Sequence, residues 1–583
     1  TDALTSPPEK ARCLSLLADL ALDPACARTL FRGGAVPQML LNVQGCTHVD
    51  ETPAAVAADD DEVDGVGRGV VGEGFECGDG RTAAAAATVT AVENAPNGGS
   101  DDVLVAGDEG EFGAGVGGGA PRRVKATVEV CRCRQAMRLL TRLVRGLPME
   151  APAVVVRHPG LGSIVQLLET AGGGSDGGVS SAAEAAAGGA LELFVAISER
   201  SRQRKELGRV PGVLESTSSY VVSKKQAQES KAGKGFGSKN YFIPATKTTT
   251  IFAFRLLANL AYADGARGRI MGFGGLTLAA AAAVSSAADE ITHRSRRSVT
   301  NSNSSRNIGT SAAAAAAGCA VEAAGEAAAA LLHRLSPVLG AEGSEDQLVA
   351  AGEALSAAVH AVSTASPGVG VVDTDTMGNL RGLVTEALSA LLILSWSDAV
   401  NLEAAAAIDW VITDAALVSS VVSLWRQGMM PPPPSPFALS SMALPFLSSV
   451  AHRQAGRSSL VAADFPSSIF SVVLQETTAA MAATMDGGPE ATGEPERGLL
   501  LLSIAERAEL LSLICVLCAS PTHRAVVRAS LLSSTSVASG NETESEAAME
   551  AQLVRLQGDN SQSSWECRSN IARLASLLGL SPP

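Results

Sequence analysis

The chain has 583 residues and a formal net charge of −15; 46% of its residues are hydrophobic but only 3% are aromatic. This length exceeds what one ordinary hydrophobic core can fill, so we expect several domains or one elongated repeat array. A net negative chain with few aromatic residues argues against a nucleic-acid-binding protein, which needs basic grooves and stacking platforms.

Two kinds of sequence alternate along the chain. The first helical stretch has apolar residues at Leu14, Leu17, Ala18 and Ala21, the i, i+3, i+4, i+7 spacing of an amphipathic helix. Between such stretches lie low-complexity segments without an apolar face to bury, which we expect to be disordered insertions. They are 45–128 (acidic, Gly/Ala-rich), 216–246 (Lys/Ser-rich), 287–311 (Ser/Arg-rich), 428–436 (Pro-rich), and the linkers 482–498 and 533–564.

The helical stretches repeat one phrase. Residues 11–21 read ARCLSLLADLA and are followed by Gly33-Gly34, and residues 254–261 read FRLLANLA and are followed by Gly274-Gly275. A Gly-Gly pair can end one helix with a left-handed residue and let the next start at a sharp angle. Looser copies begin near residues 136, 190, 387, 443, 508 and 570.

This phrase resembles the armadillo repeat motif, A-x-x-A-L-x-N-L-A followed by G-G-I-P-x-L-V-x-L-L. The match is good at 11–41 and 250–278 and looser elsewhere. HEAT repeats are the nearest alternative, and a non-repeating helical bundle is the other. The resemblance implies an all-α fold: a right-handed armadillo/HEAT-like α-solenoid over 1–583, with the insertions between its helices.

An armadillo repeat has three helices, H1, H2 and H3, and the A-x-x-A-L-x-N-L-A phrase lies on H3. The resemblance places H3 segments at 9–21, 129–145, 183–198, 247–262, 312–335, 379–395, 437–451, 500–519 and 565–579. It places H2 segments at 35–43, 160–170, 210–215, 274–286, 411–426 and 466–480. Most insertions then fall between an H2 and the following H3, so we expect them along one edge.

Short motifs in the chain do not assemble into a catalytic site. Gly67–Gly72 matches the G-x-G-x-x-G dinucleotide fingerprint, but it lies in acidic loop sequence rather than between a strand and a helix. The Lys/Gly run 231–239 lacks the phosphate-loop spacing, and Cys515 and Cys518 form one pair where structural zinc needs four ligands. We therefore expect no enzyme activity, no cofactor and no metal.

The candidate binding groove follows from the armadillo register. In importin-α-like members, Trp and Asn on H3 bind basic peptides; here no corresponding position holds Trp, and Asn259 alone keeps the Asn. The remaining groove residues are Arg138, Arg142, Arg255 and Asn259. Arginine pairs carboxylates in a bidentate way, so this set suits an extended acidic peptide, as in β-catenin-like members. The alternative is that these residues are ordinary solvated faces of amphipathic helices.

The sequence thus predicts a protein-protein interaction scaffold or adaptor that binds an extended partner along its groove. The alternative is a regulator of a folded enzyme, such as a small GTPase or a chaperone, bound through the insertion-bearing edge. Scattered cysteines and the lack of a signal peptide or membrane span favour an intracellular protein, cytoplasmic or nuclear. We expect protein partners, no small-molecule substrate and no nucleic acid; the oligomeric state stays open.

The net charge belongs to one segment. Residues 47–112 contain 16 acidic residues against Arg68 and Arg81, a net of −14, which leaves 44 acidic and 43 basic residues elsewhere. One hypothesis is that this segment competes with acidic ligands for the groove; a merely solvated charge run is the alternative.

Overall fold

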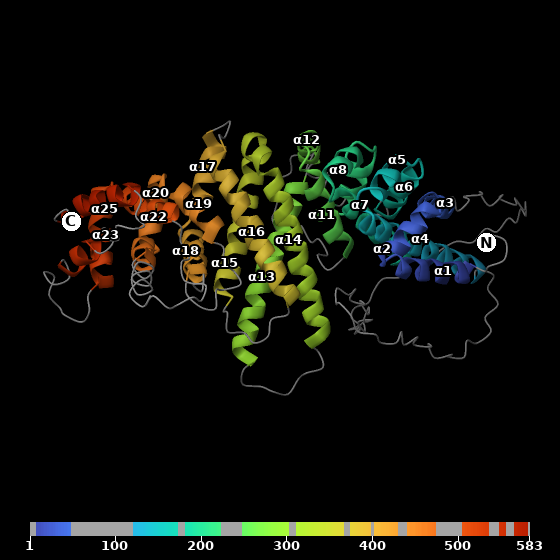
Figure 1. Cartoon of the computed structure of the whole chain (residues 1–583), viewed down its shortest axis with the longest axis horizontal. Helices are drawn as coiled ribbons and strands as arrows, with labels where there is room; N and C mark the ends of the chain where they lie inside the picture. Colours follow the sequence, from blue (N-terminus) through green and yellow to red (C-terminus); the bar gives the residue numbers. More distant parts are fainter. Residues whose placement is uncertain are drawn as a thin grey trace, which may run out of the picture.

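The computed structural model describes residues 7–47, 120–172, 181–222, 248–273, 275–301, 311–365, 374–397, 402–429, 440–473, 504–535, 547–554 and 565–580. Within these ranges the regular structure is α-helical throughout, and the helices stack into an elongated array (Figure 1). The predicted all-α solenoid is confirmed.

The helices follow the H3, H1, H2 order of an armadillo-type repeat. The H3 helices are α1 (Pro7–Leu20), α4 (Ala120–Gly146), α7 (Ser181–Ser198), α11 (Thr248–Leu260), α14 (Ser311–Glu342), α16 (Thr374–Trp396), α19 (Ser440–Ala451), α22 (Ile504–Leu517) and α25 (Trp565–Leu578). The H1 helices are α2 (Pro24–Arg32), α5 (Ala151–Arg157), α8 (Ser201–Leu207), α12 (Asp264–Met271), α17 (Leu402–Ile412), α20 (Gln454–Ala462) and α23 (Pro521–Thr535). The H2 helices are α3 (Ala35–Thr47), α6 (Leu161–Gly172), α9 (Val213–Ser219), α13 (Leu276–Asn301) and α18 (Ala415–Met429), together with the helical segments 465–473 and 547–554.

The turn into H2 depends on a left-handed residue. Gly34, Gly212 and Gly275 have φ of 79°, 82° and 87°, and each directly precedes an H2 helix. Asp464 takes the same place before the segment 465–473, with φ of 55°. Asp tolerates this conformation better than most non-glycine residues, so it can replace the glycine.

The H3 helices form a continuous ladder in which each contacts the next, from α1 through to α25. Polar contacts join the C-terminal parts of neighbouring helices: Arg142 of α4 with Asp19 of α1, and Asn259 of α11 with Ser198 of α7. Because the C-terminal part of each helix contacts the C-terminal part of the next, successive H3 helices run parallel. Their C-termini therefore share one edge of the array, from which the H1 helices begin.

The centre of the array departs from the three-helix order. After α14 the chain forms α15 (Glu345–Thr364) with no H1 helix between them, and α15 packs against α13, α17 and α18, the position of an H2 helix. The Ala-rich region 312–363 is thus a two-helix unit. Ser344 caps α15 with a reciprocal bond to Gln347, which gives this helix a defined start.

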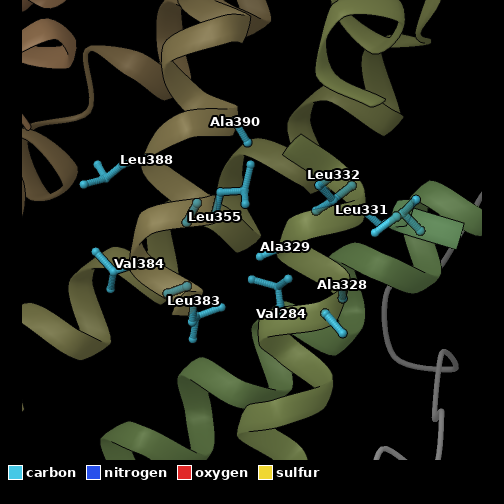
Figure 2. Close-up of a cluster of buried hydrophobic side chains, with 14 of the residues drawn as sticks. Val284, Ala328, Ala329, Leu331, Leu332, Leu355, Leu383, Val384, Leu388 and Ala390 are labelled. Atoms are coloured by element: carbon cyan, nitrogen blue, oxygen red, sulfur yellow. The ribbon is translucent and has the colours of Figure 1, made fainter. Parts of the chain in front are cut away.

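Small residues let this central unit pack closely. Figure 2 shows Val284 of α13 beside Ala329 of α14, with Leu355 of α15 and Leu383 of α16 on the other side of Ala329. All four side chains are buried in the same core. A Cβ on Gly325 would collide with the Ala287 side chain, so α13 and α14 approach at van der Waals distance. The low aromatic content of the sequence therefore matches a core built from Leu, Val and Ala.

Several predicted insertions begin or end inside helices. The range 45–128 overlaps the end of α3 and the start of α4, and α13 extends to Asn301 with Ala287, Ala288 and Ile291 buried. The range 216–246 starts within α9, where Ser216 to Ser218 are buried. Within 533–564 the segment 547–554 is helical and buries Met549 and Leu553. In these low-complexity stretches, the sequence pattern did not reveal the apolar residues that neighbouring helices bury. The ranges 430–436 and 482–498 lie outside the described residues.

The segment Thr376–Trp396 is long and apolar enough to span a bilayer, by length and composition alone. Two bent pairs pass the same test if each is one span: Gly265–Met271 with Leu276–Arg296, and Glu403–Ile412 with Ala415–Gln427. In the fold, α16 lies between α14 and α19 and also contacts α15 and α17. Its apolar character is accounted for by this central place in the core.

Candidate binding surface

The inner H3 helices, such as α11 and α14, are buried on most sides and leave a stripe of partly open positions. On α11 the open positions are Phe252, Arg255 and Asn259, spaced i, i+3, i+7, while the residues between them are buried. On α14 the open positions include Ala323, Glu326, Ala330 and Arg334, with the same helical periodicity. We call this set of positions along the ladder the H3 stripe.

Charged residues of the H3 stripe pair from one helix to the next. Both Arg138 and Arg142 contact Asp19, at Nη–Oδ1 distances of 3.4 and 2.5 Å. The next pairs along the ladder are Arg145 with Glu192 at 3.0 Å, Arg255 with Glu326 at 3.5 Å, and both His333 and Arg334 with Glu386. Acidic and basic residues therefore alternate along the stripe. The arginines predicted to line the groove, Arg138, Arg142 and Arg255, are the basic members of these pairs.

The four predicted groove residues lie on two separate helices, two on each. Arg138 and Arg142 lie on α4 and share Asp19, while Arg255 and Asn259 lie on α11. The Asn259 side-chain amide donates to Ser198 Oγ at 3.0 Å, so it links α11 to α7. Ser449 and Ser395 play a similar part between α19 and α16, at 2.7 Å. All four predicted residues therefore already have partners on the neighbouring H3 helix.

Burial and charge compete at the acidic residues of the stripe. Burial raises the pKa of Glu326 more than the adjacent Arg255 lowers it. Burial also acts to raise the pKa of Glu386, but the hydrogen bond with His333 and the charges of His333 and Arg334 outweigh it and hold that pKa below its usual range. The Glu386 carboxylate is thus firmly ionised and is held by His333 and Arg334.

Tyr262, in the turn after α11, is enclosed by two cations. The guanidinium carbons of Arg204 and Arg334 lie 4.4 and 4.1 Å from its ring centroid. Guanidinium groups stack favourably on aromatic rings, so this arrangement joins α8, α11 and α14.

Sequence reasoning missed an arginine that recurs in the H1 helices. Arg204, Arg267, Arg457 and Arg524 each donate to a backbone carbonyl six residues earlier, at Ser198, Ala261, Ala451 and Cys518, with distances of 2.7 to 3.4 Å. Each carbonyl lies at or just beyond the C-terminus of an H3 helix, where backbone acceptors lack intrahelical partners. A search for arginine six residues after the helix end would have found this signal.

The described part of the chain offers no metal-binding cluster. No group of three or more His, Cys, Asp or Glu residues there could hold a metal ion. Burial raises the pKa of Cys515 to about 11 and that of Cys518 to about 12, so both are protonated core thiols. The motifs at 67–72 and 231–239 lie outside the described residues.

Comparisons with known proteins do not assign the chain to a family. No family model matches the chain, and no curated protein matches it. Solved structures do match. One is described as "A conserved phosphorylation switch controls the interaction between cadherin and beta-catenin in vitro and in vivo"; the match has 10% identity, covers 78% of this chain and 90% of that one, and has a TM-score of 0.23. The helix order and the H3 ladder define the solenoid.

Proposed function

We propose that this protein is a non-enzymatic, intracellular scaffold that binds an extended segment of a protein partner along the H3 stripe. The observation that carries the proposal is the uninterrupted ladder of parallel H3 helices, with a partly open stripe along its inner helices. Repeat arrays of this kind offer a long binding surface without a catalytic pocket. Cross-helix ion pairs hold the stripe rigid, which lowers the entropic cost of ordering it on binding.

The pairing also constrains the partner. An acidic segment at Arg142 or Arg255 would have to displace Asp19 or Glu326 and would gain little net energy. The stripe better suits a segment of mixed charge with apolar side chains, because half-exposed apolar positions such as Ala330 and Ile393 lie between the charged ones.

The test begins with identification of partners by affinity purification and mass spectrometry. The double variant Ala323→Glu/Ala330→Glu adds bulk and charge to the stripe of α14 and keeps helix propensity. Partner recovery should fall roughly tenfold or more, as it does when central interface positions are blocked. Ala406→Glu, on the exposed side of α17, is the matched control. Equal recovery with all variants would refute the stripe as the binding surface.

A second candidate function has one observation in its favour. The longest ranges outside the described residues, 48–119, 223–247 and 474–503, each lie between an H2 helix and the next H3 helix. The chain therefore leaves and re-enters the array at one edge, where a folded enzyme such as a small GTPase or a chaperone would meet all three. Hydrogen exchange of the complex separates the two functions, because protection at the starts of H3 helices favours the second.

A further inference from the structure

A second charged surface lies along the H1 helices, which follow the C-terminal ends of the H3 helices. Exposed cations gather on α5, α8, α12 and the turns beside them, and we call these residues the H1 edge. They are Arg157, Arg200, Arg202, Lys205, Arg209 and Arg269. The three helices lie together along the upper margin of the array in Figure 1.

Side-chain contacts join the three helices of the H1 edge. Glu206 of α8 accepts from Arg157 of α5 at 3.2 Å and also lies 3.6 Å from Arg202. Arg269 of α12 donates to the Gly208 carbonyl at 3.0 Å and pairs with Glu215 at 3.2 Å. One carboxylate is thus shared by two guanidinium groups, and α8 is joined to a neighbour on each side.

The H1 edge differs from the H3 stripe in its charge balance. Arg200, Lys205 and Arg209 are exposed and have no acidic side-chain partner in the described parts of the chain. The stretch 199–209 contains five basic and two acidic residues, a net of +3. An acidic ligand would gain charge-assisted contacts here without breaking existing ion pairs, whereas on the stripe it must break them.

The residues of the edge favour a protein over a nucleic acid as the ligand. Single-stranded nucleic acids need aromatic platforms for their bases, and the stretch 199–209, which holds four of the six cations of the H1 edge, contains no aromatic residue. Arginine, the main cation of the edge, matches the bidentate geometry of carboxylates. The interspersed Glu199, Glu206 and Glu215 would repel a uniformly anionic lipid surface but can face basic residues of a protein.

We propose that the H1 edge of α5, α8 and α12 is the docking site for an acidic, Asp/Glu-rich segment of a protein partner. This inference rests on the proposed scaffold function and assigns the acidic part of its partner to a different surface from the H3 stripe. A scaffold with two such surfaces can hold the mixed-charge and acidic parts of one partner, or two partners, at once.

The experiment measures binding of a fluorescein-labelled peptide of alternating Glu, Asp and Leu to the full chain by anisotropy. The variant Arg200→Glu/Lys205→Glu/Arg209→Glu should weaken binding roughly tenfold or more, since it reverses three exposed charges at the site. Added salt should weaken wild-type binding as well. The matched control, Arg12→Glu/Arg568→Glu/Arg573→Glu, makes the same charge change on exposed faces of α1 and α25 and should bind like the wild type.

Three results would overturn the proposal. The first is no binding of the acidic peptide to the wild type. The second is equal weakening by the edge variant and its control. The third is tighter, edge-dependent binding of oligo(U) RNA or of phosphatidylserine vesicles. Neutralising Arg138, Arg142 and Arg255 to Gln should leave peptide binding within about twofold, because these groups are already paired. Failure of the peptide test leaves the scaffold proposal intact, since partner recovery with the Ala323/Ala330 variant tests that separately.

Discussion

Glu322 makes the stability of the central unit depend on pH. Its side chain is 1% exposed between α14 and α13, with Arg294 at 2.9 Å as its ion-pair partner and Glu290 nearby. Burial raises the pKa of this carboxyl from 4.5 to about 7, more than Arg294 lowers it. Glu322 Oε2 has no hydrogen-bond partner among the described residues, which fits a carboxylate that is costly to ionise.

The sign and size of the effect follow from this shift. Between pH 4.5 and 7 the native state binds more protons at Glu322 than the unfolded state, so stability falls as the pH rises through this window. At about 1.36 kcal/mol for each unit of pKa, the loss is about 3 kcal/mol by pH 8. Glu322→Gln cannot ionise, and its amide oxygen can still accept from Arg294. We expect this variant to match the wild type at pH 5 and to be about 1–3 kcal/mol more stable at pH 8.

The assay is hydrogen exchange of peptides from α13 and α14 at pH 5 and pH 8, corrected for the intrinsic rate. A local readout is needed because repeat arrays do not unfold as one two-state unit. Glu353→Gln, at an exposed position of α15, is the matched control and should change neither value. If wild type and Glu322→Gln lose protection equally between the two pH values, the reasoning on the buried carboxyl is refuted.

Three further predictions test packing and charge. Leu332→Ala at the core should cost about 2–5 kcal/mol in urea unfolding, while Leu16→Ala at a 64% exposed position should cost less than about 0.5 kcal/mol; equal costs would contradict the assigned core. Gly325→Ala should lower the melting temperature by forcing α13 and α14 apart, whereas Gly378→Ala, with no atom within 4 Å of the new Cβ, should raise it slightly; a gain from both would show that the helices do not meet at Gly325. Deleting residues 47–112, which carry a net charge of −14, should tighten binding of the acidic peptide, measured by anisotropy; unchanged affinity would remove the hypothesis of internal competition.

The sequence by itself determined the helical class, because the apolar i, i+3, i+4, i+7 spacing selects helix and a Gly such as Gly34 or Gly275 sets the turn into H2. The resemblance to the armadillo motif then placed the H3 segments, which coincide with helices of the structure. Because of their low-complexity composition, residues 287–301 and 547–554 were predicted as parts of insertions, but they are helical. There, alanine and a few large side chains such as Met549 are buried only because a neighbouring helix covers them.

Only the tertiary structure decided which charges are available to a partner. Arg142 and Asp19 are more than one hundred residues apart along the chain, and stacking of α4 on α1 brings them together. The sequence therefore showed Arg138, Arg142 and Arg255 as a basic set, while the fold pairs them with Asp19 and Glu326. It leaves Arg200, Lys205 and Arg209 on another edge without an acidic side-chain partner among the described residues. Ion pairing depends on distance in space, and in a solenoid that distance is set by the stacking of repeats.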